Sequence, residues 1–347
     1  MSFPRFDSCM ARVRAGFLAL AMGVSATVWA GNGAACNAPP MRGFNLIQDR
    51  QAPFGSALAL TSMQTMRSTG ANTVAFVPFL WQRQPTSPDL VRGDDMTDEQ
   101  LAHGIRAAHR LGLAAIVKPQ VWIPGTWAGA VHMDNEADWS TWFSRYEALV
   151  MHLAAIAARE HAQGFVIGTE LDQTVTHAQW LQLIAHVREV FHGKVSYVAH
   201  NVEGAEQVPF WAHLDSVGVT LYPSLGSDDK PDGWKRVMRD TYTRLQTLSA
   251  HTGRPVFVAE IGLRSATGAA AKPWESAEER RAPVDETLQY NVLKMWLHVL
   301  EPPVVQTVLI WRWISLPDAG GHADTDFTMQ GKLAQRMLPS LWGHCQN

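Results

Sequence analysis

Cysteine is scarce in this chain of 347 residues, which has only three copies. So few thiols exclude a disulfide-rich scaffold and a four-cysteine zinc site. The fourteen histidines form no His-Glu-x-x-His motif and no close cluster, which argues against a metal site of another kind. The chain also lacks a Gly-x-Ser-x-Gly elbow and a phosphate-binding P-loop. Metalloenzymes, serine esterases of that type and P-loop nucleotidases are therefore disfavoured.

Neither sign of charge is in marked excess, because the net charge is −3 at pH 7. A balance of this kind gives no electrostatic footprint for nucleic acid or for an anionic membrane surface. With 46% hydrophobic and 18% charged residues the composition is globular. The length suffices for a sizeable core in one large α/β domain or two smaller ones.

The first thirty residues have the pattern of a signal peptide. Arg5, Arg12 and Arg14 form a positive start, and residues 15–28 are apolar but short for a membrane span. Small residues before position 31 predict cleavage after Ala30; an uncleaved anchor is the alternative. We expect the mature protein, residues 31–347, to be exported to the periplasm or secreted, with no membrane attachment once the signal is removed.

The two remaining cysteines, Cys36 and Cys345, lie near opposite ends of the mature chain. In an oxidising compartment they are candidates for one disulfide that joins the termini. Two unpaired thiols are the alternative. Lipidation of Cys36 is less favoured, because residues 33–35 lack the leucine usual before a lipidated cysteine.

Apolar strand-like runs alternate with amphipathic stretches along the mature chain. The predicted strands are residues 41–47, 72–81, 114–123, 164–171, 196–201, 216–223, 255–262 and 305–313. The predicted helices are residues 55–68, 97–111, 135–161, 176–191, 203–213, 234–251, 285–300 and 332–341, with capping boxes opening at Thr97 and Thr176. Eight such pairs predict a parallel sheet closed into a single (β/α)8 barrel. An open doubly wound sheet is the runner-up, but residues 45–50 are not its glycine-rich phosphate turn.

Two of the predicted strands carry a glutamate near their carboxyl ends, Glu170 and Glu260, and each glutamate closes a short apolar run. Both runs are continuously apolar, so a carboxylate at their ends is costly to desolvate and needs a reason. In a barrel these strands lie nearly opposite each other, with their carboxyl ends on the active-site face. A pair of carboxyls there is typical of glycosidases, and a short separation of ~5–5.5 Å favours retention of configuration. The charge of the nucleophile is then expected to keep the acid protonated. Helix capping or an arginine partner for either residue is the structural alternative.

From residue 41 to residue 338 the sequence resembles glycoside hydrolase family 113, the endo-β-mannanase-like barrels of clan A. The resemblance rests on the stretches Val117-Lys-Pro-Gln120, Trp127-Ala-Gly129, Ile167-Gly-Thr-Glu-Leu171, Phe210–Tyr222, Ala259–Ser265, Ile310-Trp-Arg-Trp313 and Gly331-Lys332. It implies that Glu170 is the acid/base and Glu260 the nucleophile, and that Tyr222 hydrogen-bonds the nucleophile. An ordinary rim tyrosine is the alternative for Tyr222.

Two positions depart from the family pattern. Thr169 stands where most of the clan has an asparagine whose amide binds the sugar 2-hydroxyl, so that contact is made by a shorter hydroxyl or supplied elsewhere. Gln120 replaces a histidine after Lys-Pro. Both changes bear on substrate preference more than on the type of reaction.

Further substrate-binding candidates lie at predicted strand ends. Trp311 and Trp313 share one face if their strand stays extended, and Trp313, nearer the end, is the preferred sugar platform. Lys118 is either a buried ion-pair partner or a donor to a sugar hydroxyl. The remaining candidates, which orient substrate or acid or offer weaker platforms, are His200, Asn201, Trp122 and Trp81.

We therefore predict a retaining glycoside hydrolase that acts on a β-linked polysaccharide or oligosaccharide, with β-mannan implied only by the resemblance. Such chemistry needs no cofactor and no metal, and we expect a monomer. Two alternatives stay open: a clan A hydrolase for another β-glycan, and a non-catalytic carbohydrate-binding or exopolysaccharide-assembly protein on the same barrel.

Overall fold

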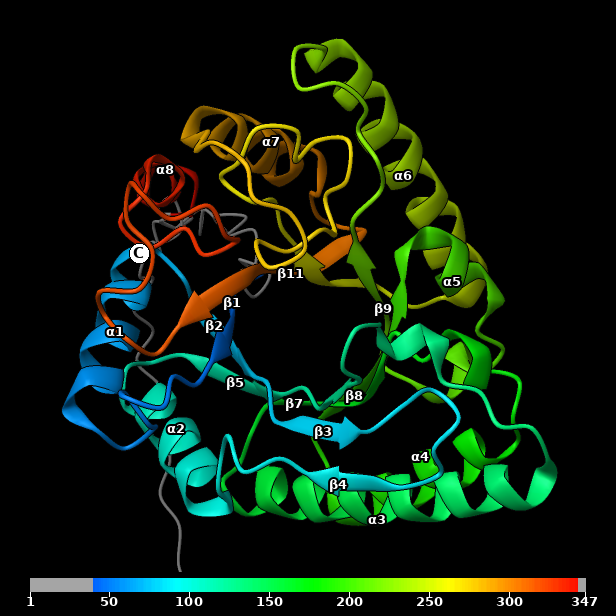
Figure 1. Ribbon diagram of the computed structural model, residues 1–347. Coiled ribbons are helices and arrows are strands. Elements are labelled where there is room, and N and C mark those ends of the chain that lie inside the picture. Colours follow the sequence, from blue (N-terminus) through cyan, green and yellow to red (C-terminus); the bar gives the residue numbers. More distant parts are fainter. Residues whose placement is uncertain (1–39, 343–347) are drawn as a thin grey trace, which may run out of the picture. The chain divides into compact units, whose positions relative to one another are not determined.

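A computed structural model describes residues 40–342 (Figure 1). The predicted signal peptide, Cys36 and Cys345 lie outside these residues, so signal cleavage and disulfide pairing stay predictions. Within residues 40–342, no helix is long and apolar enough to cross a membrane.

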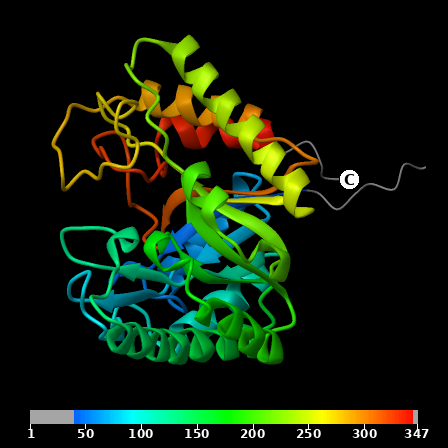
Figure 2. The ribbon, with the colours of Figure 1, turned by 90° about the vertical axis from the view of Figure 1, so that its right-hand side faces the viewer.

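Eight parallel strands close into a barrel, and helices surround it (Figures 1 and 2). The order around the barrel is β1-β11-β10-β9-β8-β7-β5-β2. Its strands are β1 (Met41–Ile47), β2 (Thr73–Phe76), β5 (Ala114–Val117), β7 (Gly164–Thr169), β8 (Lys194–His200), β9 (Ser216–Leu221), β10 (Val256–Ile261) and β11 (Val305–Ile314). The predicted (β/α)8 barrel is thus confirmed, with β7 as its fourth strand and β10 as its seventh.

The helices follow the predicted order with small differences at their ends. They are α1 (Ala57–Ser68), α2 (Asp98–Arg110), α3 (Glu136–Arg159), α4 (Gln179–Val190), α5 (Asn201–Gln207), α6 (Pro231–Thr252), α7 (Glu286–Val299) and α8 (Leu333–Trp342). The capping box of Thr97 and Gln100 is confirmed, with both reciprocal hydrogen bonds formed. The second capping box is wrong: α4 starts after Ala178, whose side chain cannot cap it.

Two predicted strands are each divided in two by a proline. The first stretch stops at Phe76 and resumes as β3 (Phe79–Gln82), and the second stops at Val117 and resumes as β6 (Gln120–Trp122). Pro78 and Pro119 stand in the gaps, where a residue without an N–H group cannot continue the ladder. The resumed halves pair with each other and with β4 (Leu90–Arg92) in a small separate sheet of order β4-β3-β6.

Apolar side chains fill the barrel interior, and a larger apolar cluster lies between the barrel and its helices. The inner set is Ala75, Ile116, Val166, Val198, Phe257, Ala259 and Leu309. Below it, at the amino-terminal ends of the strands, lies a cavity of about 630 Å³ that Met41, Gly164 and Ser216 help to line. This cavity is at the end of the barrel opposite Glu170 and Glu260, so it is separate from the candidate site.

Candidate active site

The two glutamates lie where the sequence places them, at the carboxyl ends of the fourth and seventh barrel strands. Glu260 is the fifth residue of β10 and is buried. Glu170 directly follows β7 with a φ of 55°, in the left-handed region that non-glycine residues rarely adopt. Asn201, after β8, has a φ of 52°. Such backbone strain is typical of functional sites.

Both carboxylate oxygens of Glu260 are held by donors from neighbouring strand ends. The ammonium of Lys118 donates to Oε1 at 2.6 Å, and the hydroxyl of Tyr222 donates to Oε2 at 2.8 Å. Lys118 is fully buried, so its role as an ion-pair partner is the one the structure bears out. The expected hydrogen bond from Tyr222 is also present. These donors favour the ionised carboxylate and fix its orientation.

Glu170 is held through one oxygen only. Its Oε1 atom accepts from the Thr220 hydroxyl at 2.6 Å and lies 3.0 Å from His200 Nδ1. No donor among residues 40–342 reaches Oε2. His200 is thus a partner of the acid/base candidate, and Thr220 is a member of the site that our sequence analysis missed, although it lies in a stretch shared with the family.

The same threonine relates the two glutamates in space. Thr220 on β9 is the register partner of Glu260 on β10. Neighbouring strands lie about 4.8 Å apart, and the Thr220 side chain reaches the carboxylate of Glu170. The two carboxyl groups therefore converge over β9 at the mouth of the barrel.

The pKa shifts reflect the unequal surroundings of the two acids. Burial acts to raise the pKa of Glu170, but the hydrogen bond from His200, the charge of His200 when it is protonated, the Thr220 hydroxyl and the Lys118 charge together lower the pKa below its ordinary value. Burial raises the pKa of Glu260 above its usual range, against the charge of Lys118, and the charge of Glu170 adds to the increase. We expected Glu260 to raise the pKa of Glu170; beside a charged His200 this pKa is lowered instead, so proton donation by Glu170 requires an uncharged His200.

His200 and Asp172 complete this group of titrating residues. Burial acts to lower the pKa of His200, whereas the hydrogen bond and charge of Glu170 raise it above its ordinary value. Burial raises the pKa of Asp172 to about 6. A proton on His200 therefore makes it harder for Glu170 to hold one.

The two positions that depart from the family pattern are also resolved. The Thr169 hydroxyl is fully buried and donates to the Pro119 carbonyl at 3.2 Å, so it does not take over the sugar contact. Gln120 Oε1 accepts from Lys118 at 3.2 Å. Because an ammonium can only donate, this contact fixes the amide and leaves Gln120 Nε2 as the available donor.

The two tryptophans of β11 point to different sides of the sheet, contrary to our preference for Trp313. The ladder between β1 and β11 pairs Phe44 with Ile310 and Leu46 with Trp313, which leaves one extra residue in β11. Such a bulge breaks the alternation of faces. Trp313 is fully buried behind the sheet, where its indole donates to Ser62. Trp311 is partly exposed and lies 5.5 Å below the Lys118 ammonium, so it is the sugar platform candidate.

Three exposed tryptophans follow β2 and β5 on the same side of the barrel. Trp81 and Trp122, two of the predicted candidates, are register partners on β3 and β6 with ring centroids 6.3 Å apart. Trp127, which was given no role, packs against His200 with ring centroids 4.7 Å apart. Each is about 40% exposed, at 38%, 42% and 42% respectively. These exposed rings make up the aromatic surface on this side of the barrel, with Trp127 nearest the acid/base candidate.

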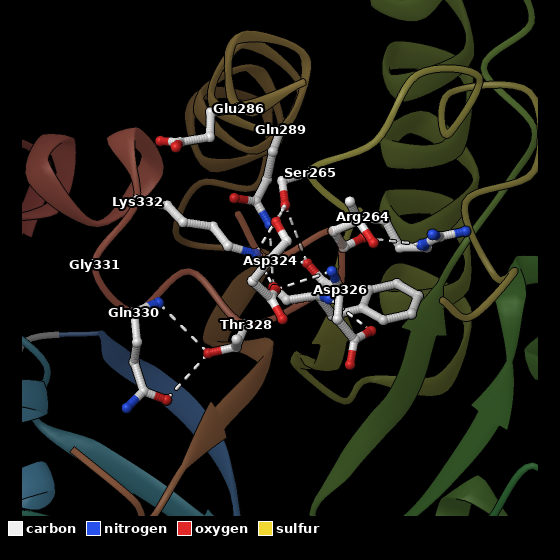
Figure 3. Close-up of polar contacts among 12 residues, drawn as sticks. Arg264, Ser265, Glu286, Gln289, Asp324, Asp326, Thr328, Gln330, Gly331 and Lys332 are labelled. Atoms are coloured by element: carbon white, nitrogen blue, oxygen red, sulfur yellow. Dashed lines mark hydrogen bonds and ion pairs between the residues drawn. The ribbon is translucent and has the colours of Figure 1, made fainter. Parts of the chain in front are cut away.

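A buried lysine ties the loop after β11 to the loop after β10 (Figure 3). The Lys332 ammonium, fully buried, donates to Ser265 Oγ at 2.8 Å, to the Asp326 carbonyl at 2.9 Å and to Asp324. The Asp326 carboxylate in turn pairs with Arg312, whose guanidinium lies 5.8 Å from the Trp311 ring. The tie thus positions the residues beside the platform. Among residues 40–342 no group of acids, histidines or cysteines could hold a metal ion.

A closed (β/α)8 barrel with two convergent glutamates at its fourth and seventh strand ends defines a barrel glycoside hydrolase. The model of Glycoside Hydrolase Family 113 matches residues 44–332. The chain belongs to this family and is a glycoside hydrolase.

Solved structures share the fold at low sequence identity. A β-mannanase of the same family from Alicyclobacillus acidocaldarius is 24% identical, with a TM-score of 0.77 over 88% of this chain and 97% of its own. A second β-1,4-mannanase of the family is 23% identical, with a TM-score of 0.77 over 88% and 99% of the two chains. A β-glucuronidase from Ruminococcus gnavus is 13% identical, with a TM-score of 0.60 over 88% and 50%. No curated protein matches the sequence.

Proposed function

We propose that the protein is a retaining hydrolase of β-linked polysaccharide, with β-1,4-mannan as its substrate, in which Glu260 is the nucleophile and Glu170 the acid/base. The observation that carries the proposal is the contrast between the two carboxylates. Both oxygens of Glu260 accept donors that favour its ionised form, whereas Glu170 keeps one oxygen available for proton transfer.

The reaction then runs in two displacements. Glu260 attacks the anomeric carbon while Glu170 Oε2 gives its proton to the departing glycosidic oxygen, so the C–O bond breaks as an ester bond to Glu260 forms. In the second step Glu170 Oε2 takes a proton from water, whose oxygen attacks the anomeric carbon and releases Glu260. Configuration is retained, and each carboxyl returns to its starting state.

The choice of β-mannan is supported by the two related β-mannanases. The aromatic surface supports a polymeric substrate, because indole faces stack on sugar rings. Trp311 lies beside the nucleophile's partner Lys118, and Trp127 beside the acid/base's partner His200, so we place sugars on both sides of the cleaved bond. The leader-like first thirty residues support export, either to the periplasm or out of the cell, where such a polymer is met.

The test compares Glu260→Ala and Glu170→Gln with Glu189→Gln, an exposed glutamate on α4. Reducing-end release from β-1,4-mannan should fall by several orders of magnitude in Glu260→Ala and by roughly 10²–10⁴-fold in Glu170→Gln, while Glu189→Gln matches the wild type. On an aryl β-mannoside with a good leaving group, Glu170→Gln should still form the glycosyl ester, because no acid is needed. For the wild-type enzyme, proton NMR of the hydrolysis should show the β-anomer as the first product. Near-normal turnover by either site variant would refute the assignment.

A further inference from the structure

The amide of Asn201 has a fixed orientation. Its Oδ1 atom accepts the backbone N–H of Tyr222 at 2.7 Å. A backbone N–H can only donate, so the amide nitrogen must be the atom that lies 2.9 Å from His200 Nε2. That nitrogen is also only a donor, and His200 Nε2 is consequently the acceptor of this hydrogen bond.

The acceptor role of Nε2 fixes the proton on the other side of the imidazole ring. A neutral histidine with an unprotonated Nε2 carries its hydrogen on Nδ1. Nδ1 then donates to Glu170 Oε1, the atom that the Thr220 hydroxyl also reaches. With two donors on Oε1, a proton on Glu170 has its place on Oε2.

We propose that Asn201 holds His200 as the neutral Nδ1–H tautomer, and that His200 and Thr220 together confine the transferable proton of Glu170 to Oε2. Both Asn201 and His200 are then positioning residues that act through the acid/base. This inference rests on the proposed role of Glu170.

The charged groups around His200 favour its protonated form rather than the neutral tautomer. Four carboxylates surround the ring. Glu170 follows β7, Asp172 begins the 3-10 turn Asp172–Thr174, Glu203 lies on α5 and Glu260 lies on β10. The cation Lys118 acts on Glu170 from the end of β5. Trp127 covers the ring without a charge. The carboxylates favour an imidazolium, and the Asn201 amide opposes it by presenting a donor to Nε2.

The tautomer matters because Glu170 must work in two protonation states. An imidazolium 3.0 Å from Oε1 would stabilise the carboxylate and weaken the acid needed in the first step. A neutral Nδ1–H donor suits both states, since Oε1 accepts in the acid and in the carboxylate alike. The proton can therefore leave and return at Oε2 without rearrangement of the site.

The test exchanges the donor that faces Nε2. Asn201→Asp keeps the shape, tolerates the positive φ and keeps an acceptor for the Tyr222 N–H, but it places an acceptor against Nε2 and so favours the imidazolium. Asn201→Gly also tolerates the positive φ and removes the side chain. Melting temperatures of both variants report on folding. Activity is measured against pH on β-1,4-mannan and on 2,4-dinitrophenyl β-mannoside, whose leaving group needs no acid.

We expect the alkaline limb of kcat/KM on mannan to move about one pH unit lower in Asn201→Asp, with a roughly tenfold rise in the ratio of aryl-mannoside to mannan activity. Asn201→Gly should shift the limb in the same direction by less. Nitrogen-15 spectra of labelled histidine, assigned with His200→Gln, should show the neutral Nδ1–H tautomer in the wild type near its optimum and an imidazolium in Asn201→Asp.

Either of two results would overturn the inference. The first is a wild-type His200 that, at the pH of maximal activity, is charged or carries its proton on Nε2. The second is an Asn201→Asp enzyme whose alkaline limb and whose ratio of aryl-mannoside to mannan activity equal those of the wild type. Failure of the proposed function looks different. In that case the wild type and Glu260→Ala release equal amounts of sugar, while the nitrogen-15 spectra still report the tautomer.

Discussion

Trp311 and Trp313 stand two positions apart and have opposite surroundings, so they form a matched pair for mutation. Trp313→Ala should lower the free energy of unfolding by about 3–5 kcal/mol, because the indole is fully buried and donates to Ser62. Its turnover per folded molecule should stay close to that of the wild type.

Trp311→Ala should do the reverse. It removes a partly exposed ring beside Lys118, so kcat/KM on mannan should fall roughly tenfold or more, the equivalent of about 1.4 kcal/mol of lost sugar contact, with little change in unfolding. Urea unfolding followed by tryptophan fluorescence and initial rates on the same samples separate the two effects. Equal losses of activity in both variants would contradict the placement of the platform.

Lys118 acts to lower the pH at which Glu260 ionises. Burial raises the pKa of Glu260, and the Lys118 charge is the first of the influences that lower it. Lys118→Met should therefore raise this pKa further. Since the nucleophile must be ionised, the acidic limb of kcat/KM should move to higher pH, and activity should be lost earlier as the pH falls. A pH–rate profile measures the shift, with melting temperature as the control for folding; an acidic limb that stays in place would show that the ion pair does not tune Glu260.

Part of the site could be predicted at the level of single residues, and the reasons for the limits are physical. Glu170, Glu260 and Tyr222 stand out because polar groups end apolar strands. The directions of the two pKa shifts could not be predicted, because they depend on which neighbour lies within hydrogen-bond distance. The left-handed backbone at Glu170 likewise has no signal in the residue type, whereas Asn201 is of a type that adopts it more readily.

At the scale of elements, the alternation of apolar and amphipathic stretches predicts the barrel strands well. The errors have local causes that the sequence does contain: Pro78 and Pro119 divide two runs that we treated as single strands. The bulge in β11 is different, because it is defined by pairing with β1, a segment that lies far away in the sequence. It alone reverses the expected orientation of Trp313.

The Lys332 tie between the loops after β10 and β11 belongs to the same scale. Lys332→Met removes a buried ammonium with three hydrogen-bond partners, so we expect a loss of about 2–3 kcal/mol in the free energy of unfolding. The value of KM should also rise, because Asp326 no longer holds Arg312 beside Trp311.

Lys235→Met is the matched control for this tie, because Lys235 forms a largely exposed pair with Asp232 on α6. Exposed pairs of this kind contribute only about 0–1 kcal/mol. Urea titrations and mannan kinetics on the two variants supply the comparison. If both behave alike, the tie does not position the platform.

At the scale of the whole molecule, barrel closure brings the two described ends of the chain together. Arg42 at the start of β1 donates to the Leu341 carbonyl of α8 at 3.3 Å, and the rings of Phe44 and Trp342 lie 5.6 Å apart. These contacts support the prediction that Cys36 and Cys345, a few residues beyond these ends, form a disulfide if the protein is exported to an oxidising compartment. A crosslink that closes so long a loop should add about 2–5 kcal/mol to the free energy of unfolding, chiefly by restricting the unfolded chain.

Peptide mass mapping without reductant should recover the two cysteines in one linked species. Reductant should lower the melting temperature of the wild type but not that of Cys36→Ser, whereas alkylation of both thiols in unreduced protein from an oxidising compartment would show that they do not pair.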